Sequence, residues 1–368
     1  MQDLSAIQEQ VLRKHLRPTS RDFALADQYF TRIREAVKQC AQESQLNIAF
    51  IRLEGSAGLK QTQLRNSREL DVFIGLPQQL LIDELNSPHP PKALVRKLLS
   101  DLVKRVAFKA AELAGCHNIN IAHAEHPYVT AALDDHQVDL VFCFDLPLEY
   151  ISENGPITAV DRTIHHSHFV SEHLSPSQRD DVRLLKAFFQ SGFVYGDMSP
   201  VGRSGFTGFS AEILIYHTHN FANALEELKR IPLKPLDYFG RPIPELRKRF
   251  QDDYLIIIDP TDPNRNLAAS ISKRAHNYAR HLAAQLLANP DPVYFIPKDI
   301  PVLSLEEEKQ LGKNYLIIIF EDETGWHYTK TRDKLYKYFN NLCNFLSYEA
   351  TGEKRFGRCL FEDRGRVR

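Results

Sequence analysis

Apolar residues follow two different spacings along the first 150 residues of the chain. Residues 21–46 and 92–114 carry apolar side chains at the spacing of an amphipathic helix, and the second pattern ends at Gly115. Short apolar runs stand before and after the second helix. They predict strands at 47–53, 70–76, 119–125, 128–133 and 137–146. We therefore predict a small mixed sheet backed by helices.

The pattern changes after a polar, Gly- and Pro-containing linker at 148–160. Residues 161–231 have mostly helical spacing, and LIIID at 255–259 predicts a short buried strand. The segment DPTDPNRN that follows is rich in turn-forming residues and is expected to open a helix at about 266–288. Nearer the C-terminus we predict a strand, a hairpin, a helix and a last strand, at 316–320, 321–330, 333–350 and 358–363.

A chain of 368 residues is too long for one ordinary hydrophobic core and indicates two or three domains. The predicted elements give the fold class α+β, because the helices and strands do not simply alternate. We place a mixed-sheet head at residues 1–150, a mainly helical central domain at 151–272, and a small α/β domain at 273–368.

Composition and charge narrow the class of protein. The 46 basic and 47 acidic residues nearly cancel, so any attraction to nucleic acid has to come from local patches. The longest apolar runs have the length of strands, and the N-terminus lacks the apolar core of a signal peptide, so no membrane association is expected. Five scattered cysteines without a C-x-x-C pair predict reduced thiols and a cytoplasmic location.

Two acidic residues, Glu69 and Asp71, stand at the start of the apolar run 70–76. Residues two apart in a strand point to the same face, so these carboxylates are expected side by side. Asp139 has the equivalent place in a later strand, as the one acid early in the run VDLVFCF. Three such acids repel one another unless cations lie between them, and carboxylate oxygens suit Mg²⁺ or Mn²⁺ shared with phosphates.

Gly55 and Ser56 precede this acidic pair by thirteen residues or more. A glycine lets the backbone approach a ligand closely, and backbone amides at the opening of a helix bind phosphate oxygens. Together with the acids, Gly-Ser indicates a site for a nucleoside triphosphate and two metal ions. An ordinary turn followed by a chance acidic strand end is the alternative interpretation.

A series of further segments can be read in a fixed order along the chain. They are AEHPYV (124–129), VDLVFCF (138–144), AVDRTIHH (159–166), VRLLKAFF (182–189), VYG (194–196), SGFTGFSAEILI (204–215) and DPTDPNRNLAAS (259–270). This series resembles the archaeal-type (class I) CCA-adding tRNA nucleotidyltransferases of the polymerase-beta nucleotidyltransferase superfamily. The resemblance covers residues 20–290 well and implies a polymerase-beta-like nucleotidyltransferase head.

The resemblance implies that Glu69, Asp71 and Asp139 hold two Mg²⁺ ions, with Mn²⁺ as an alternative. Such ions would activate the 3′-hydroxyl of an RNA end, align it with the α-phosphate and neutralise the leaving pyrophosphate. Asp139 would lie nearest the attacking oxygen and assist its deprotonation. Gly55 and Ser56 occupy the place of the phosphate-contacting Gly-Ser pair of the family.

The resemblance also implies nucleotide-binding residues in the middle of the chain. Those expected to hold the triphosphate and the sugar are Thr163, His166, Lys186 and Tyr195. Arg265 resembles an arginine that helps to select the incoming base while it touches the RNA backbone, a double task that suits a planar guanidinium. His126 resembles a residue near the wall of the active site.

The lysine and the histidines of this set also allow a plainer interpretation. Lys186 is the one cation in LLKAFF and needs a partner such as phosphate, but it could also extend along its helix to solvent. His126 could be an ordinary half-buried histidine with hydrogen-bond partners. The run HHSH, which holds His165, His166 and His168, lacks a Cys or acidic partner at a zinc-motif spacing, so zinc is not expected.

The chain departs from the family pattern in two places. The loop AGLKQ at 57–61 is one residue longer than the family's loop and lacks its arginine, for which Lys60 is the candidate replacement. The sequence ends at Arg368, where family members continue through a further tail segment that grips the far side of the tRNA elbow. The sequence therefore supports recognition of the whole upper half of a tRNA less strongly than it supports the catalytic residues.

The resulting functional hypothesis is template-independent transfer of CMP and AMP, from CTP and ATP, to the 3′ end of tRNA. One alternative is an enzyme of the same fold that makes an oligonucleotide signal or modifies another RNA or a protein. A non-catalytic RNA-binding relative is a third. The middle segments through Arg265 favour the RNA end, and the intact acidic triad argues against a non-catalytic protein.

Overall fold

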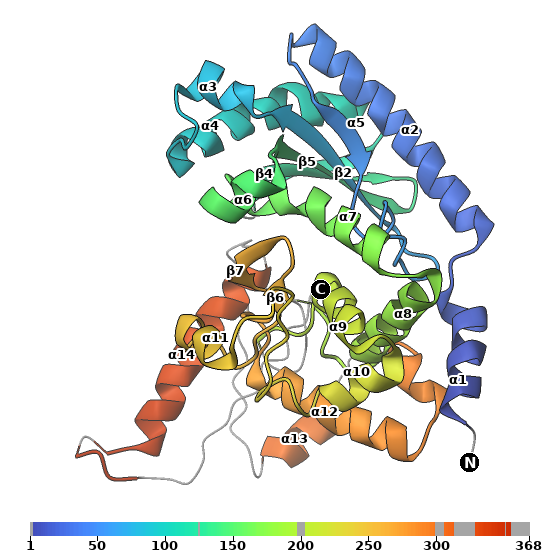
Figure 1. Ribbon diagram of the computed structural model, residues 1–368, viewed down its shortest axis with the longest axis vertical. Coiled ribbons are helices and arrows are strands. Elements are labelled where there is room, and N and C mark those ends of the chain that lie inside the picture. Colours follow the sequence, from blue (N-terminus) through green and yellow to red (C-terminus); the bar gives the residue numbers. More distant parts are fainter. Residues whose placement is uncertain are drawn as a thin grey trace.

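The computed structural model describes residues 3–123, 126–196, 203–298, 305–312, 328–349 and 351–354. Figure 1 shows a half built on a β-sheet above a half built of helices, with helix α7 (Thr163–His173) between them. We call residues 20–154 the sheet half, and residues 4–16 together with 176–288 the helical half. In the part of the chain that the structure describes, no helix is long and apolar enough to cross a membrane.

The sheet half confirms the predicted strands, with bounds shifted by a few residues. Its strands are β1 (Phe50–Leu53), β2 (Glu69–Pro77), β3 (His117–His123), β4 (Pro127–Leu133) and β5 (His136–Asp145). Their order in the sheet is β1-β2-β5-β4-β3. The pair β2 and β5 runs parallel, whereas the other three pairs are antiparallel, so the sheet is mixed as predicted.

Helices pack on one face of this sheet. The long helix α2 (Ser20–Glu43) begins at a capping box between Thr19 and Asp22 and confirms the first predicted helix. The second predicted helix forms as one helical run of α4 (Lys92–Leu102), the π-helical η2 (Val103–Phe108) and α5 (Lys109–Leu113). The shorter helices α3 (Gln79–Leu85) and α6 (Leu148–Asn154) complete the sheet half.

Strand β2 shows how the two faces of the sheet differ. Leu70, Val72 and Ile74 are buried in the core that the sheet shares with the helices. Phe73, the next residue but one after Asp71, lies on the opposite face and packs in a cluster that includes Ile164 of α7. The acidic residues of β2 therefore lie on the face that looks toward α7 and the helical half.

Most of the helical half shares one core, and Leu246 packs in a separate small cluster with Ile256 and Ile258. Its helices are α1 (Leu4–Val11), η1 (Leu12–Leu16), α8 (Pro176–Ser191), α9 (Gly208–Thr218), α10 (Phe221–Glu227), α11 (Ile243–Arg249) and α12 (Lys273–Ala288). The 3₁₀ turns η3 (Ala159–Arg162) and η4 (Pro292–Phe295) stand before α7 and after α12. Ile7 and Val11 of α1 belong to this core and not to that of the sheet. The domain boundaries stay a prediction.

The prediction for residues 255–288 was wrong in detail. Only β6 (Ile258–Asp259) of the expected strand forms, and it pairs with β7 (Asp262–Asn266), where a loop was expected. The Asn266 side chain accepts hydrogen bonds from the backbone N–H groups of Ile257 and Ala268, each at 2.9 Å, so a side chain replaces part of the strand pairing. Helix α12 then begins only at Lys273, after its cap Ser272.

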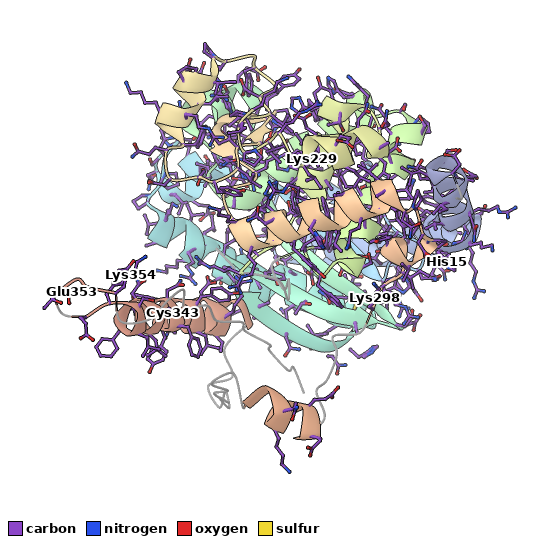
Figure 2. All side chains as sticks on the ribbon, turned by 90° about the horizontal axis from the view of Figure 1, so that it is seen from below. His15, Lys229, Lys298, Cys343, Glu353 and Lys354 are labelled. Atoms are coloured by element: carbon purple, nitrogen blue, oxygen red, sulfur yellow. The ribbon has the colours of Figure 1, made fainter. Side chains whose placement is uncertain are left out.

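Near the C-terminus the structure describes α13 (Leu305–Gly312) and α14 (Tyr328–Ser347). The helix predicted at 333–350 is confirmed as α14, which begins earlier and takes in the end of the predicted hairpin. The strands predicted at 316–320 and 358–363, and the rest of the hairpin, lie outside the described residues. Figure 2 shows α14 projecting to one side, with Cys343 on it and Glu353 and Lys354 beyond.

Candidate active site

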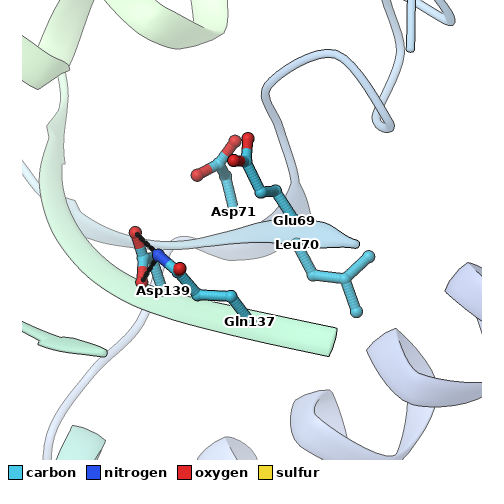
Figure 3. Close-up of a pocket in the computed structure, with 5 residues that line it drawn as sticks. All are labelled: Glu69, Leu70, Asp71, Gln137 and Asp139. Atoms are coloured by element: carbon cyan, nitrogen blue, oxygen red, sulfur yellow. Dashed lines mark hydrogen bonds between the residues drawn. The ribbon is translucent and has the colours of Figure 1, made fainter. Parts of the chain in front are cut away.

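The parallel pairing of β2 and β5 brings the predicted acids together. Asp71 lies opposite Asp139 in the register, and Glu69 lies opposite Gln137. These four residues and Leu70 line a hollow of about 170 Å³ at the start of both strands, which Figure 3 shows from close by. The position predicted for Asp139, equivalent to that of the acidic pair on β2, is confirmed.

The environment of Asp71 is strongly unfavourable to its negative charge. Burial of the side chain, reinforced by the nearby charges of Asp139 and Glu69, raises the pKa of Asp71 to about 6. Gly55 presses against the same carboxylate: a Cβ atom at Gly55 would lie 2.0 Å from Oδ2 of Asp71, and the φ of Gly55 is +64°. Any side chain at Gly55 would have to displace the acid and would adopt a backbone conformation that favours glycine.

The donor set fits a divalent cation. Glu69, Asp71 and Asp139 offer carboxylate oxygens only, which suit hard cations, and their mutual repulsion is what a cation would relieve. As placed, no three His, Cys, Asp or Glu side chains among the described residues are gathered as a preformed metal site. Gln137 donates to both oxygens of Asp139, at 3.2 and 3.4 Å, and Figure 3 shows Asp139 beside Gln137 and apart from the other two acids. Binding a cation would therefore need a rotation of these side chains.

The loop after Gly55 contains turns and no helix, so the expected phosphate site does not include a helix start. The N–H of Gly58 donates to the carbonyl of Glu54 at 3.1 Å, and the N–H of Thr62 donates to the carbonyl of Ser56 at 3.0 Å. Arg183 of α8 donates to the carbonyl of Gln63 at 2.9 Å and also to that of Gln61. The loop that departs from the family pattern is thus held by the helical half.

Lys60 and Lys186 meet at one buried carboxylate, that of Glu212 on α9. Lys60 donates to Oε2 of Glu212 at 3.0 Å, and Lys186 donates to Oε1 at 3.1 Å. The hydroxyl of Thr62 donates to Oε1 at 2.6 Å and accepts from Lys186 at 2.9 Å. Lys186 therefore does not extend to solvent, and the partner that its apolar surroundings require is a carboxylate.

A second cluster stands beside the lysines. The ring of His166 stacks on Phe209 with 3.8 Å between centroids, and the ammonium of Lys60 lies 4.6 Å from the centroid of the same ring. His166 hydrogen-bonds to Asp259 at 2.8 Å, and Arg265 donates to the same carboxylate oxygen at 2.9 Å. Burial lowers the pKa of His166 to about 4, so this histidine is neutral at pH 7.

The remaining predicted residues lie around these clusters. Burial of Tyr195, reinforced by the charges of Glu212 and Glu69, raises the pKa of its hydroxyl. A Cβ at Gly208 would lie 3.1 Å from that hydroxyl. Thr163 is the first residue of α7, and His126 is buried directly before β4.

Sequence reasoning missed several residues of this site. Glu212, Thr62, Phe209 and Asp259 each contact a residue that was predicted. Glu212 could have been found, since it is the one acid in the apolar run AEILI and so needs a cation, the argument applied to Lys186. Nothing in the local sequence pairs these two residues, which come from different helices.

The fold is similar to that of polymerase-beta-like nucleotidyltransferases. A solved structure described as the basis for the activity of a cytoplasmic RNA terminal U-transferase matches with a TM-score of 0.56 at 14% identity, over 81% of this chain and 99% of that chain. Residues 180–296 match the family model described as "tRNA nucleotidyltransferase, second domain".

Curated relatives narrow the family further. The CCA-adding enzyme of Methanocaldococcus jannaschii is 31% identical over 78% of this chain and 61% of its own length. The CCA-adding enzyme of Saccharolobus solfataricus is 33% identical over 86% of this chain and 66% of its own length. The chain belongs to the archaeal-type tRNA nucleotidyltransferase family, and it spans a little under two thirds of the length of these relatives.

Proposed function

We propose that the protein transfers CMP and AMP, from CTP and ATP, to the 3′-hydroxyl of tRNA without a template. The observation that carries the proposal is the register of β2 and β5, which sets Asp71 beside Asp139 on the face that looks toward the helical half. The names of the curated relatives support the substrates. The cytoplasm stays the predicted location.

In this proposal the acids hold the cations, and the nucleotide supplies the phosphorus atom that is attacked. Two divalent cations, Mg²⁺ or Mn²⁺, held by Glu69, Asp71 and Asp139, would supply Lewis acidity and charge neutralisation. The 3′-oxygen forms a bond to the α-phosphorus of the triphosphate, and the bond from that phosphorus to the bridging oxygen of the β-phosphate breaks. Asp139 receives the hydroxyl proton, and pyrophosphate leaves.

Residues of the helical half and of the loop at 55–62 bind the nucleotide. We assign contacts with the triphosphate and the sugar to Gly55, Ser56, Lys60, Thr163, His166, Lys186 and Tyr195. Arg265 has an exposed side-chain fraction of 37%, although its guanidinium is anchored on buried Asp259. It is therefore free to contact a base with its remaining donors, which suits a role in nucleotide choice. His126 is assigned to the wall of the site.

The test is incubation of the protein with Mg²⁺, labelled CTP and ATP, and a tRNA that ends before CCA. Ordered addition of C, C and then A supports the proposal, and a tRNA that already carries CCA serves as the control that is not extended. Consumption of triphosphates without extension of any RNA would refute it. That result would favour synthesis of an oligonucleotide signal by the same fold.

A further inference from the structure

The carboxylate of Glu212 joins two parts of the chain that are far apart in sequence. It accepts from Lys60 and Thr62 in the loop after β1, and from Lys186 on α8. Glu212 is 1% exposed, Thr62 is fully buried, and the two lysines are 6% and 3% exposed. A buried polar group of this kind is stable only when its partners are in place.

The charges of this group do not balance. Two ammonium groups share one carboxylate, at 3.0 and 3.1 Å, which leaves one excess positive charge at the contact. The contrast is Asp237, a buried carboxylate that pairs with the single cation Arg241 at 2.6 Å.

The excess charge lies beside the acidic hollow. The loop that carries Lys60 begins at Gly55, whose backbone lies against the carboxylate of Asp71. The backbone of Gly208 lies against both Tyr195 and the end of Lys186. The cluster and the hollow are therefore neighbouring parts of one site.

We infer that Glu212 is a positioning residue of the triphosphate site. It holds the ammonium groups of Lys60 and Lys186 together next to the acids, and it leaves a positive charge that the polyphosphate of an incoming nucleotide neutralises. The inference rests on the proposed function for the location of the triphosphate. It adds that an acid, which cannot itself attract phosphate, determines how tightly the triphosphate binds.

The experiment measures binding of CTP with Mg²⁺ by calorimetry in the absence of RNA, so it does not depend on nucleotide transfer. Glu212→Gln keeps the size of the side chain and removes its charge, and Asp237→Asn is the matched control at the buried ion pair with Arg241. We expect Glu212→Gln to raise the Kd for CTP about tenfold or more, because the lysines lose their common anchor. Asp237→Asn should leave the Kd within about twofold, even if both variants melt at lower temperature.

Unchanged CTP binding by Glu212→Gln would overturn the inference and leave Glu212 a structural role only. If Glu212→Gln does not fold, Glu212→Asp replaces it, since it keeps the charge and withdraws it by one methylene group. An increase of about threefold or more in the Kd for CTP is then expected, and an unchanged value overturns the inference. A wild-type protein that binds CTP but extends no tRNA would refute the proposed function while the role of Glu212 in binding stands or falls on its own measurement.

Discussion

The sheet half supplies the acids that line the hollow of the candidate site, whereas the cations come from its loop at 55–62 and from the helical half, and the two sets are placed in different ways. The acids lie on two adjacent strands, where the period of two and a parallel register put Asp71 beside Asp139. The cations come from segments far apart, since Lys60 and its partner Glu212 are separated by 152 positions. A local rule thus places Glu69 and Asp71 on one face, whereas strand pairing brings Asp139 to them and only the assembled fold places the cations.

The pKa of a buried acid is shifted in opposite directions in the two halves. In the sheet half, burial and the neighbouring acids raise the pKa of Asp71 to about 6, and the nearby charge of Lys60 opposes this rise only in part. In the helical half, burial would raise the pKa of Glu212, but Lys60 and Lys186 outweigh it and lower the pKa to about 2. A triphosphate with its divalent cations would complete both halves at once, because it carries both signs of charge.

The largest effect is expected at the acids. Asp71→Asn should lower nucleotide transfer by about a thousandfold or more, since it removes a charged oxygen donor from the proposed cation site. The control is Asp135→Asn, an exposed acid in the turn before β5. The measurement is extension of tRNA under single-turnover conditions, and activity retained by Asp71→Asn would break the metal assignment.

The contact between Gly55 and Asp71 gives a sharper test of the sheet half. Gly55→Ala should lower transfer about a hundredfold, because the new Cβ would displace the Asp71 carboxylate. Gly240→Ala is the control: Gly240 has nearly the same φ, +68°, but no atom within 4 Å of the added Cβ. Backbone strain lowers the free energy of unfolding of both variants by about 1–2 kcal/mol. Equal activity of the two variants would show that the approach of Gly55 to the acid is unimportant.

Substitution of Arg265 tests whether the helical half selects the incoming nucleotide. Arg265→Ala should change the choice between CTP, ATP and UTP by about tenfold, because its guanidinium is the group assigned to the incoming base. Arg249→Ala, in the nearby helix α11, removes an exposed arginine that hydrogen-bonds Asn264 and should leave the choice unchanged. Competition between labelled nucleotides is the measurement. An equal loss for every nucleotide would contradict a role of Arg265 in selection.

The smallest expected effect is a pH dependence of stability due to His166. The pKa of this histidine falls from 6.5 to about 4 on burial, against Asp259 and beside Lys60, Phe209 and Arg265. The unfolded chain therefore binds more protons between these two values, so the free energy of unfolding decreases as the pH falls through this range. The loss attributable to His166 is on the order of 1–3 kcal/mol.

Urea unfolding at several pH values, compared between the wild type and His166→Gln, isolates this contribution. The variant should show a flatter dependence between pH 6.5 and 4. The control is His89→Gln, at an exposed histidine of the sheet half, which should behave as the wild type. Parallel curves for the wild type and His166→Gln would mean that His166 is not held neutral by burial.

Much of the sheet half could be predicted from the spacing of apolar residues along the sequence. Its five strands and both of its long helical runs were predicted, because each obeys a spacing that depends on neighbours in sequence. Residues 255–288 were predicted less well, since the side chain of Asn266 takes over backbone hydrogen bonds that a spacing rule cannot anticipate. The roles assigned to the site residues stay predictions until they are tested.

The sequence by itself determined the acids, the faces of the strands that carry them and the family of the chain. These follow from residue types and short-range spacing, which do not change when the chain folds. Tertiary structure alone decided that Lys60, Thr62 and Lys186 gather on Glu212, and that Asp259 holds both His166 and Arg265. The physical reason is that a buried charge must find its partner in space, and that partner can lie anywhere along the chain.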